Sequence, residues 1–192
     1  MSLDQVSIFL ALLALGALIL GTLALAAAVV ADPVRRAAQI RPLLIPLAMM
    51  VALTATAGSL YYSKIADYPV CELCWYQRIC MYPLGALLAV AYLRRDRRGG
   101  WYVLPLSAVG LAVSVYHYQL QLFPGQGSSC DVAAPCTFKW VDELGFVTIP
   151  FMAGCGFVAI TGLAVLSLRW QDDMVRDEMS AAVVDRLDRE LL

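Results

Sequence analysis

Long uncharged stretches are the feature of this sequence that most restricts its fold. Four of them contain at least the ~20 residues that an α-helix needs to cross a bilayer. They cover residues 5–31, 43–63, 101–130 and 144–168, and a fifth candidate, 73–93, is interrupted only by Arg78. The chain is 61% hydrophobic and 15% charged, whereas soluble proteins are about 25% charged. An ordinary soluble domain is therefore excluded.

These stretches predict an all-α integral membrane protein with five transmembrane helices. The residues between them form loops and tails that are too short for a separate extramembrane domain. The predicted helices cover residues 6–31, 43–63, 73–93, 101–123 and 149–169.

The arginines predict how the chain is oriented in the membrane. Short cytoplasmic loops are enriched in Lys and Arg. Eleven arginines follow the first, third and fifth predicted helices, whereas the opposite side has only Lys64, Lys139 and Arg78, the last just inside a helix. The eleven are Arg35, Arg36, Arg41, Arg94, Arg95, Arg97, Arg98, Arg169, Arg176, Arg186 and Arg189. We therefore expect the N-terminus outside, the C-terminus in the cytoplasm and the two longer loops on the oxidising side.

The two ends of the chain need separate interpretations. Residues 29–31 resemble a signal-peptidase site, but residues 1–5 contain no basic residue, so we expect the first helix to be a retained anchor. In the tail, apolar residues recur every four positions and predict an amphipathic helix. They are Val175, Met179, Val183, Leu187 and Leu191. We expect this amphipathic helix to lie on the bilayer or on the inner loops. The alternative is a helix that docks to a partner protein.

Two cysteines stand at the outer end of the third predicted helix. Cys71 and Cys74 form a Cys-x-x-Cys motif, and Arg78 follows Cys74 by one helical turn. A helix N-terminus and a nearby cation both stabilise thiolate, so we expect Cys74 to be reactive. The alternatives are a structural disulfide, an arginine that extends to the membrane surface, and zinc binding. The cysteine spacing and the lack of a neighbouring histidine fit zinc poorly.

A second cysteine pair lies in the other outer loop. Cys130 and Cys136 stand among Gly, Ser and Pro residues, which predicts an exposed, mobile loop. An accessible disulfide there could be attacked by the thiolate of another protein; a bond that only shapes the loop is the alternative. Sequence permits three pairings of the four cysteines, and the short separations favour 71–74 and 130–136. Residues 138–146 alternate apolar and charged side chains and predict a segment at the membrane surface.

Two cysteine pairs on one side of a membrane suggest electron transfer from a soluble protein to a lipid-soluble acceptor such as a quinone. The sequence Cys-x-Leu-Cys-Trp-Tyr-Gln-Arg-Ile-x-Met-Tyr-Pro-Leu at 71–84 resembles the DsbB/BdbC family of bacterial disulfide-forming membrane oxidoreductases. Cys130-x5-Cys136 followed by Gly-Phe-x-Thr-Ile-Pro-Phe at 145–151 resembles its BdbC branch. The resemblance covers residues 43–169.

The resemblance implies a four-helix redox bundle over residues 43–169 in the bacterial cytoplasmic (inner) membrane. The chain departs from the family in its extra N-terminal transmembrane helix and cytoplasmic loop at residues 1–42, to which the resemblance assigns no role. We expect residues 170–192 to form the amphipathic cytoplasmic tail. The implied partners are a DsbA-like thioredoxin-fold protein, a membrane quinone (ubiquinone or menaquinone) and the lipid bilayer, with no nucleic acid and no metal.

The resemblance also implies roles for single residues. Cys130 and Cys136 would meet the donor protein, and Cys71 and Cys74 would meet the quinone. The residues implied at the quinone are Arg78, Gln77 and His117.

Cys80 and Cys155 lie within predicted helices and outside the motifs, and we expect them only to pack as small apolar side chains. The main alternative function is a non-catalytic membrane protein with disulfide-stapled loops, of the adhesion or channel type. Arg78 beside Cys74 argues against it, since a staple needs no cation. A reductase of the vitamin K epoxide type is a further alternative, but its usual features are not found around Cys71.

Overall fold

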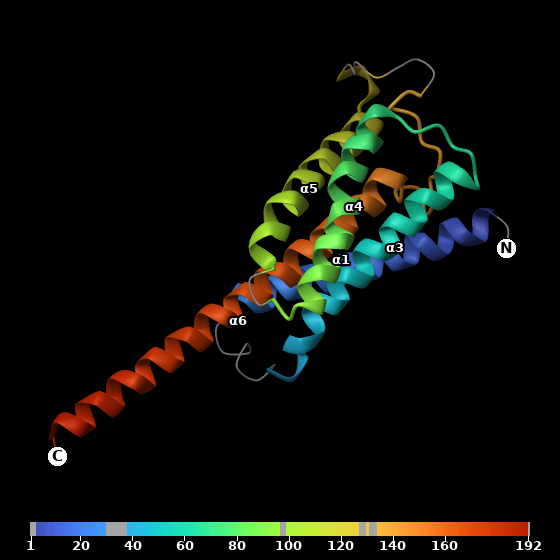
Figure 1. Cartoon of the computed structure of the whole chain (residues 1–192). Helices are drawn as coiled ribbons and strands as arrows, with labels where there is room; N and C mark the ends of the chain where they lie inside the picture. Colours follow the sequence, from blue (N-terminus) through green and yellow to red (C-terminus); the bar gives the residue numbers. More distant parts are fainter. Residues whose placement is uncertain (1–2, 30–37, 97–98, 127–129, 131–133, 192) are drawn as a thin grey trace.

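A computed structural model describes residues 3–29, 38–96, 99–126, 130 and 134–191 of the chain. Over these residues it consists of long helices, and the longest connection between them is residues 123–148, between α5 and α6 (Figure 1). The helices are α1 (Leu3–Val29), α3 (Leu44–Lys64), α4 (Glu72–Leu93), α5 (Gly100–Leu122) and α6 (Ile149–Leu191), with short 3-10 helices η1 (Ala38–Leu43) and η2 (Pro124–Gln126). The all-α fold predicted from the sequence is confirmed.

The helices run alternately up and down. In Figure 1 the N-terminus, the α3–α4 connection and the loop before α6 lie toward one end of the bundle, and the C-terminus lies at the other. Both cysteine pairs are therefore at the same end, as the charge pattern predicts. Arg35, Arg36, Arg97 and Arg98 of that pattern lie outside the described residues.

Four of the helices are long and apolar enough to cross a membrane by length and composition: α1, α3, α5 and residues 149–170 of α6. Helix α4 has 22 residues but is less apolar, because it contains Glu72, Gln77 and Arg78. It packs between α3 and α5 within the bundle. The polar residues that weaken its hydropathy are those of the predicted redox motif.

Helix α6 lies at the centre of the bundle. It contacts α1, α3 and α5, and 67% of its most apolar stretch is buried, against 22% for α1 and for α3. Phe157 of α6 is fully buried, and its ring occupies the place where a side chain at Gly110 of α5 would lie. The hydrophobic core therefore forms around α6 and holds the other helices in place.

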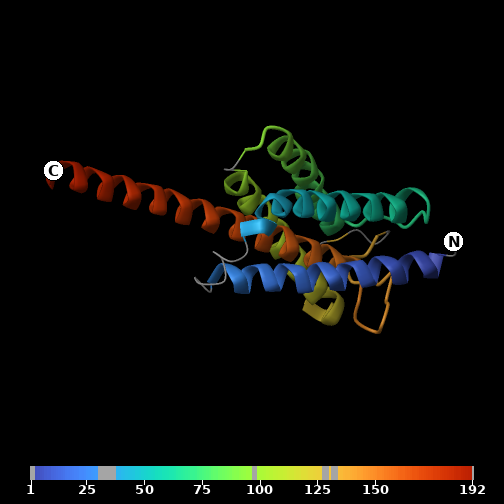
Figure 2. The same cartoon turned by 90° about the horizontal axis from the view of Figure 1, so that it is seen from below.

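The C-terminal tail differs from our expectation. It is helical, as the apolar spacing predicts, but it continues α6 without a break to Leu191. Figures 1 and 2 show it projecting away from the bundle instead of lying on the inner loops. No Gly or Pro follows Gly162, so nothing in the sequence ends the helix at the predicted membrane boundary.

Candidate redox site

Cys71 and Cys74 meet at the N-terminus of α4. Cys71 is the N-cap residue, with extended backbone angles (φ −72°, ψ 166°), and its Sγ accepts a hydrogen bond from the backbone N–H of Cys74 at 3.3 Å. This capping places the two Sγ atoms 2.8 Å apart. Cys71 is 5% exposed, and Cys74 is half-buried. The pair is therefore arranged to interconvert between dithiol and disulfide.

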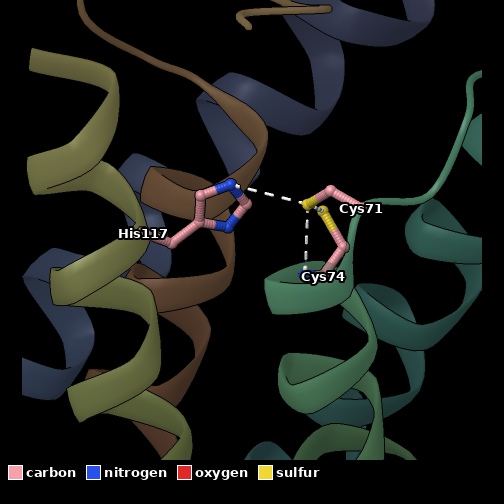
Figure 3. A group of neighbouring side chains, drawn as sticks. All are labelled: Cys71, Cys74 and His117. Carbon is pink, nitrogen blue, oxygen red and sulfur yellow. Dashed lines mark hydrogen bonds between the residues drawn. The ribbon is translucent and has the colours of Figure 1, made fainter. Parts of the chain in front are cut away.

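His117 of α5 connects this pair to the second one. Its Nε2 lies 3.7 Å from Cys71 Sγ and 3.1 Å from the carbonyl oxygen of Cys136, and Figure 3 shows the imidazole directed at the two sulfurs. A carbonyl oxygen can only accept, so Nε2 carries the hydrogen. The buried Nδ1 has no hydrogen-bond partner among the described residues. An N–H donor thus faces Cys71 from the side of the second loop.

These contacts favour the thiolate of Cys71. The hydrogen bond with the Cys74 thiol is the largest cause that lowers the pKa of Cys71 below its usual value; burial opposes it, and His117 adds to the lowering. We expected the more stable thiolate at Cys74. The structure differs because the Cys74 thiol, His117 and the N-cap position all act on Cys71.

His117 lies beside the two cysteines and could supply a third zinc ligand, which the sequence did not indicate. The ligand atoms of Cys71, Cys74 and His117 all lie within 4.8 Å of one another. Two sulfurs bound to one tetrahedral zinc at about 2.3 Å each are about 3.8 Å apart. The observed 2.8 Å is shorter than that, so the arrangement fits sulfur–sulfur chemistry better than a metal centre.

The second pair forms a disulfide. Cys130 and Cys136 are bonded, with their Cα atoms 5.9 Å apart, in agreement with the pairing favoured by the sequence. Cys136 is 1% exposed, whereas Cys130 is half-buried. An external thiolate therefore reaches Cys130 more easily than Cys136. The expected mobility of this loop concerns residues 127–129 and 131–133, which lie outside the described residues.

The segment after this disulfide packs on the end of the bundle. Trp140 stacks on Tyr68 of the α3–α4 connection, with ring centroids 5.6 Å apart. The hydroxyl of Tyr118 donates to the carbonyl oxygen of Phe146 at 3.1 Å. Phe138 is 52% exposed, and Leu144 is 66% exposed. The segment thus combines anchoring contacts with exposed apolar side chains, as a segment at the membrane surface requires.

Arg78 is fixed by contacts within the bundle. Its Nε donates to Ser59 Oγ, and a terminal guanidinium nitrogen donates to the carbonyl oxygen of Ser59, both at 3.0 Å. Its guanidinium carbon lies 5.4 Å from the centroid of the Trp75 ring. An arginine that only extends to the membrane surface would not need this two-point attachment to α3.

A cavity of about 410 Å³ lies beside Cys74 and Arg78. Its wall is mainly apolar and comes from α1, α3, α4, α6, the α3–α4 connection and Trp140. Gln77 also lines it, although its amide donates to Ser114 Oγ of α5 at 2.9 Å. The described lining contains Cys74 but neither Cys71 nor His117. Cys71 therefore faces the second cysteine pair, and Cys74 faces the cavity.

Sequence reasoning missed several polar residues of this cavity. Ser59, Tyr62, Tyr68 and Tyr82 all line it, and the hydroxyls of Ser59 and Tyr82 are 3.3 Å apart. Tyr82 follows Arg78 by four positions, so helical spacing could have identified it. Ser59, Tyr62 and Tyr68 lie outside the motif, and no sequence pattern indicated that they line a cavity.

Cys80 and Cys155 are free and buried, at 5% and 3% exposure. Cys80 belongs to the hydrophobic core. These surroundings support the expectation that the two cysteines pack as small apolar side chains.

Known proteins with similar sequences fit this site. A family model described as "Disulfide bond formation protein DsbB" matches residues 41–170. A "Probable disulfide formation protein" of Oceanobacillus iheyensis is 44% identical over 67% of this chain and 90% of its own length. "Disulfide bond formation protein C" of Bacillus subtilis is 44% identical over 58% of this chain and 82% of its own. No solved structure gives a significant match.

Proposed function

Because this chain belongs to the DsbB family of disulfide bond formation proteins, we propose that it oxidises an extracytoplasmic DsbA-like thioredoxin-fold protein and delivers the electrons to a membrane quinone. The chain is a multi-pass membrane protein of a disulfide-forming family. The observation that carries the proposal is His117, which contacts both Cys71 Sγ and the Cys136 carbonyl. This contact brings two cysteine pairs from distant parts of the sequence together.

The donor protein reacts first with the second pair. A donor thiolate attacks Cys130 Sγ, the more accessible sulfur, and the Cys130–Cys136 bond breaks with Cys136 leaving as a thiolate. The second donor cysteine then attacks the mixed disulfide and displaces Cys130. The donor leaves with a disulfide, and Cys130 and Cys136 hold the two electrons as a dithiol.

The electrons then pass to the first pair. Cys136 lies on the Cys71 side of the site, so its thiolate attacks Cys71 Sγ of the oxidised pair, and Cys74 leaves as a thiolate facing the cavity. Cys130 then displaces Cys71, which restores the Cys130–Cys136 disulfide. His117 supplies an N–H to Cys71 at this point, and such a donor stabilises a sulfur that leaves as thiolate.

The cavity fits a quinone. Its apolar wall suits an isoprenoid chain, and Arg78, Ser59 and Tyr82 contribute polar groups to the cavity that Cys74 also lines. A bound quinone would take up two electrons and two protons from the Cys71–Cys74 dithiol. Arg78 would hold a quinone oxygen, because its guanidinium is already fixed by Ser59 and its unused N–H groups remain donors.

The proposed location is the bacterial cytoplasmic membrane, with the N-terminus outside and the C-terminus in the cytoplasm. The arginine distribution supports this orientation. It puts both cysteine pairs on the oxidising side, where a secreted thioredoxin-fold protein would meet them.

Reconstitution tests the function directly. The purified protein, placed in lipid vesicles, receives a reduced DsbA-like protein and a soluble quinone analogue in the absence of oxygen. We expect one quinol for each donor dithiol oxidised, and no quinol from a Cys130→Ala variant given the same donor. Donor oxidation without quinol formation would contradict the assignment of quinone as acceptor.

A further inference from the structure

Helix α1 lies outside the residues that match the family model, yet it is firmly attached to the bundle. A Cβ added at Gly21 of α1 would lie 2.6 Å from the Cα of Ala159. A Cβ added at Gly162 of α6 would collide with the carbonyl oxygen of Gly21. The backbones of α1 and α6 are therefore in direct contact, which a loosely attached membrane anchor would not require.

A second attachment joins α1 to α3 nearer the cysteine end. The hydroxyl of Tyr62 donates to Ser7 Oγ at 3.2 Å, and both side chains are 5% exposed. Leu10 packs on Gly58, where an added Cβ would lie 3.3 Å from it. Helix α1 is thus fixed to α3 at one level and to α6 at another. Figure 2 shows it running alongside the bundle.

Between these two attachments, α1 forms part of the cavity wall. It contributes only apolar residues, which extend over about 15 Å from Leu10 to Leu20 at 1.5 Å per residue. They are Leu10, Leu12, Leu13, Ala14, Gly16, Ala17 and Leu20. The same cavity contains Cys74 and Arg78 in its wall. The apolar surface of α1 and the side chain of Cys74 are thus parts of one cavity.

We propose that α1 forms the wall against which the isoprenoid chain of the quinone lies, while the quinone ring lies at Cys74 and Arg78. This inference rests on the proposed function. The wall is entirely apolar where α1 supplies it, whereas α3, α4 and their connection supply polar groups. This division matches a ligand with a polar ring and a long hydrocarbon chain. Helix α1 is then part of the acceptor site and not an accessory anchor.

Bulk added to α1 inside and outside the cavity tests the inference. Ala17 lines the cavity, whereas Ala26 of the same helix is exposed and lies outside its described lining. We compare Ala17→Phe with the matched control Ala26→Phe by quenching of tryptophan fluorescence, because Trp140 also lines the cavity. The ligands are a quinone with an isoprenoid chain and the same ring without the chain.

We expect Ala17→Phe to weaken binding of the long-chain quinone about tenfold, which corresponds to losing the burial of about two methylene groups. Binding of the chain-free ring should stay within twofold in both variants, and Ala26→Phe should bind both ligands like the wild type. Quinone that co-purifies with the protein should fall in parallel.

Two outcomes would overturn the role of α1, and a third would overturn the proposed function. Equal long-chain affinity in Ala17→Phe and wild type would overturn the role of α1 alone, as would phospholipid co-purifying in place of quinone. Failure of the wild-type protein to bind either quinone would instead overturn the proposed function. If Ala17→Phe does not fold, Gly16→Leu replaces it, because a Cβ at Gly16 meets no other heavy atom within 4 Å.

Discussion

The Nε2 atom of His117 lies 3.7 Å from the sulfur of Cys71, although 46 positions separate the two residues in the sequence. The contact joins α5 to the N-terminus of α4 at the end of the bundle where the second cysteine pair also lies (Figures 1 and 3). His117 thus acts on the sulfur that would accept electrons from Cys136.

We expect His117→Ala to raise the pKa of Cys71 toward the usual thiol value of about 8.5. The histidine lowers this pKa, so without it the thiolate fraction near pH 7 falls. The shift will be partial, because the larger lowering comes from Cys74. The thiolate absorbance of the reduced protein, measured against pH with Cys71→Ser as the reference, reports it. Gln119→Ala, which removes an exposed amide from the same helix, is the control and should leave the titration unchanged.

The different exposure of Cys130 and Cys136 predicts where the donor protein binds covalently. Both Cys130→Ala and Cys136→Ala should abolish turnover with a protein dithiol, while a small dithiol still reduces the Cys71–Cys74 disulfide. When the donor keeps one reactive cysteine that carries a thionitrobenzoate group, only Cys136→Ala should form a mixed disulfide with it, because the accessible Cys130 thiolate attacks the donor sulfur and thionitrobenzoate leaves. Non-reducing electrophoresis shows this species. Full activity of Cys130→Ala with the protein donor would show that the second pair has only a structural role.

Arg78→Lys should raise the apparent KM for a soluble quinone analogue. Lysine cannot reproduce the planar group that now bonds to Ser59 in two places. Loss of one hydrogen bond to a charged partner corresponds to about 1.5–3 kcal/mol, or roughly 10- to 150-fold in affinity. The same variant should still exchange disulfides with the donor in a single turnover without quinone. A KM within twofold of wild type would show that Arg78 acts only as a membrane anchor.

The orientation can be tested with reporter fusions. A reporter that works only in the cytoplasm should be active after Leu192, and one that works only outside should be inactive there. This follows from the arginines beside the ends of the predicted helices. The opposite result would contradict the five-span arrangement and would favour cleavage after the first apolar stretch.

The positions of the helices could be predicted from the sequence because charged residues bound the uncharged stretches. Helix α3 was predicted at 43–63 and found at Leu44–Lys64, and α5 was predicted at 101–123 and found at Gly100–Leu122. The length of α6 was not predicted. Arg169 ends the uncharged stretch, but a charged residue does not interrupt an α-helix, and α6 continues to Leu191.

The arrangement inside the site was harder to predict. The motif identified Cys71, Cys74 and Arg78 as neighbours, since local spacing along one helix places them. It did not reveal that His117 contacts Cys71 or that Ser59 holds Arg78. Both are contacts between helices, and they depend on how α4 packs against α3 and α5. Sequence periodicity defines the faces of one helix but not which faces meet.

The contact between Gly21 and Gly162 joins α1 to α6, two helices that the chain separates by α3, α4 and α5. Because synthesis runs from the N-terminus, α1 can pack against α6 only after α3, α4 and α5 have been made and residues 149–170 have followed them. The cavity beside Cys74 has walls from both helices, so a partly synthesised chain lacks it. Synthesis of residues 149–170 thus completes the cavity, and a chain truncated before them has the cysteines but lacks the α6 wall of the cavity beside them.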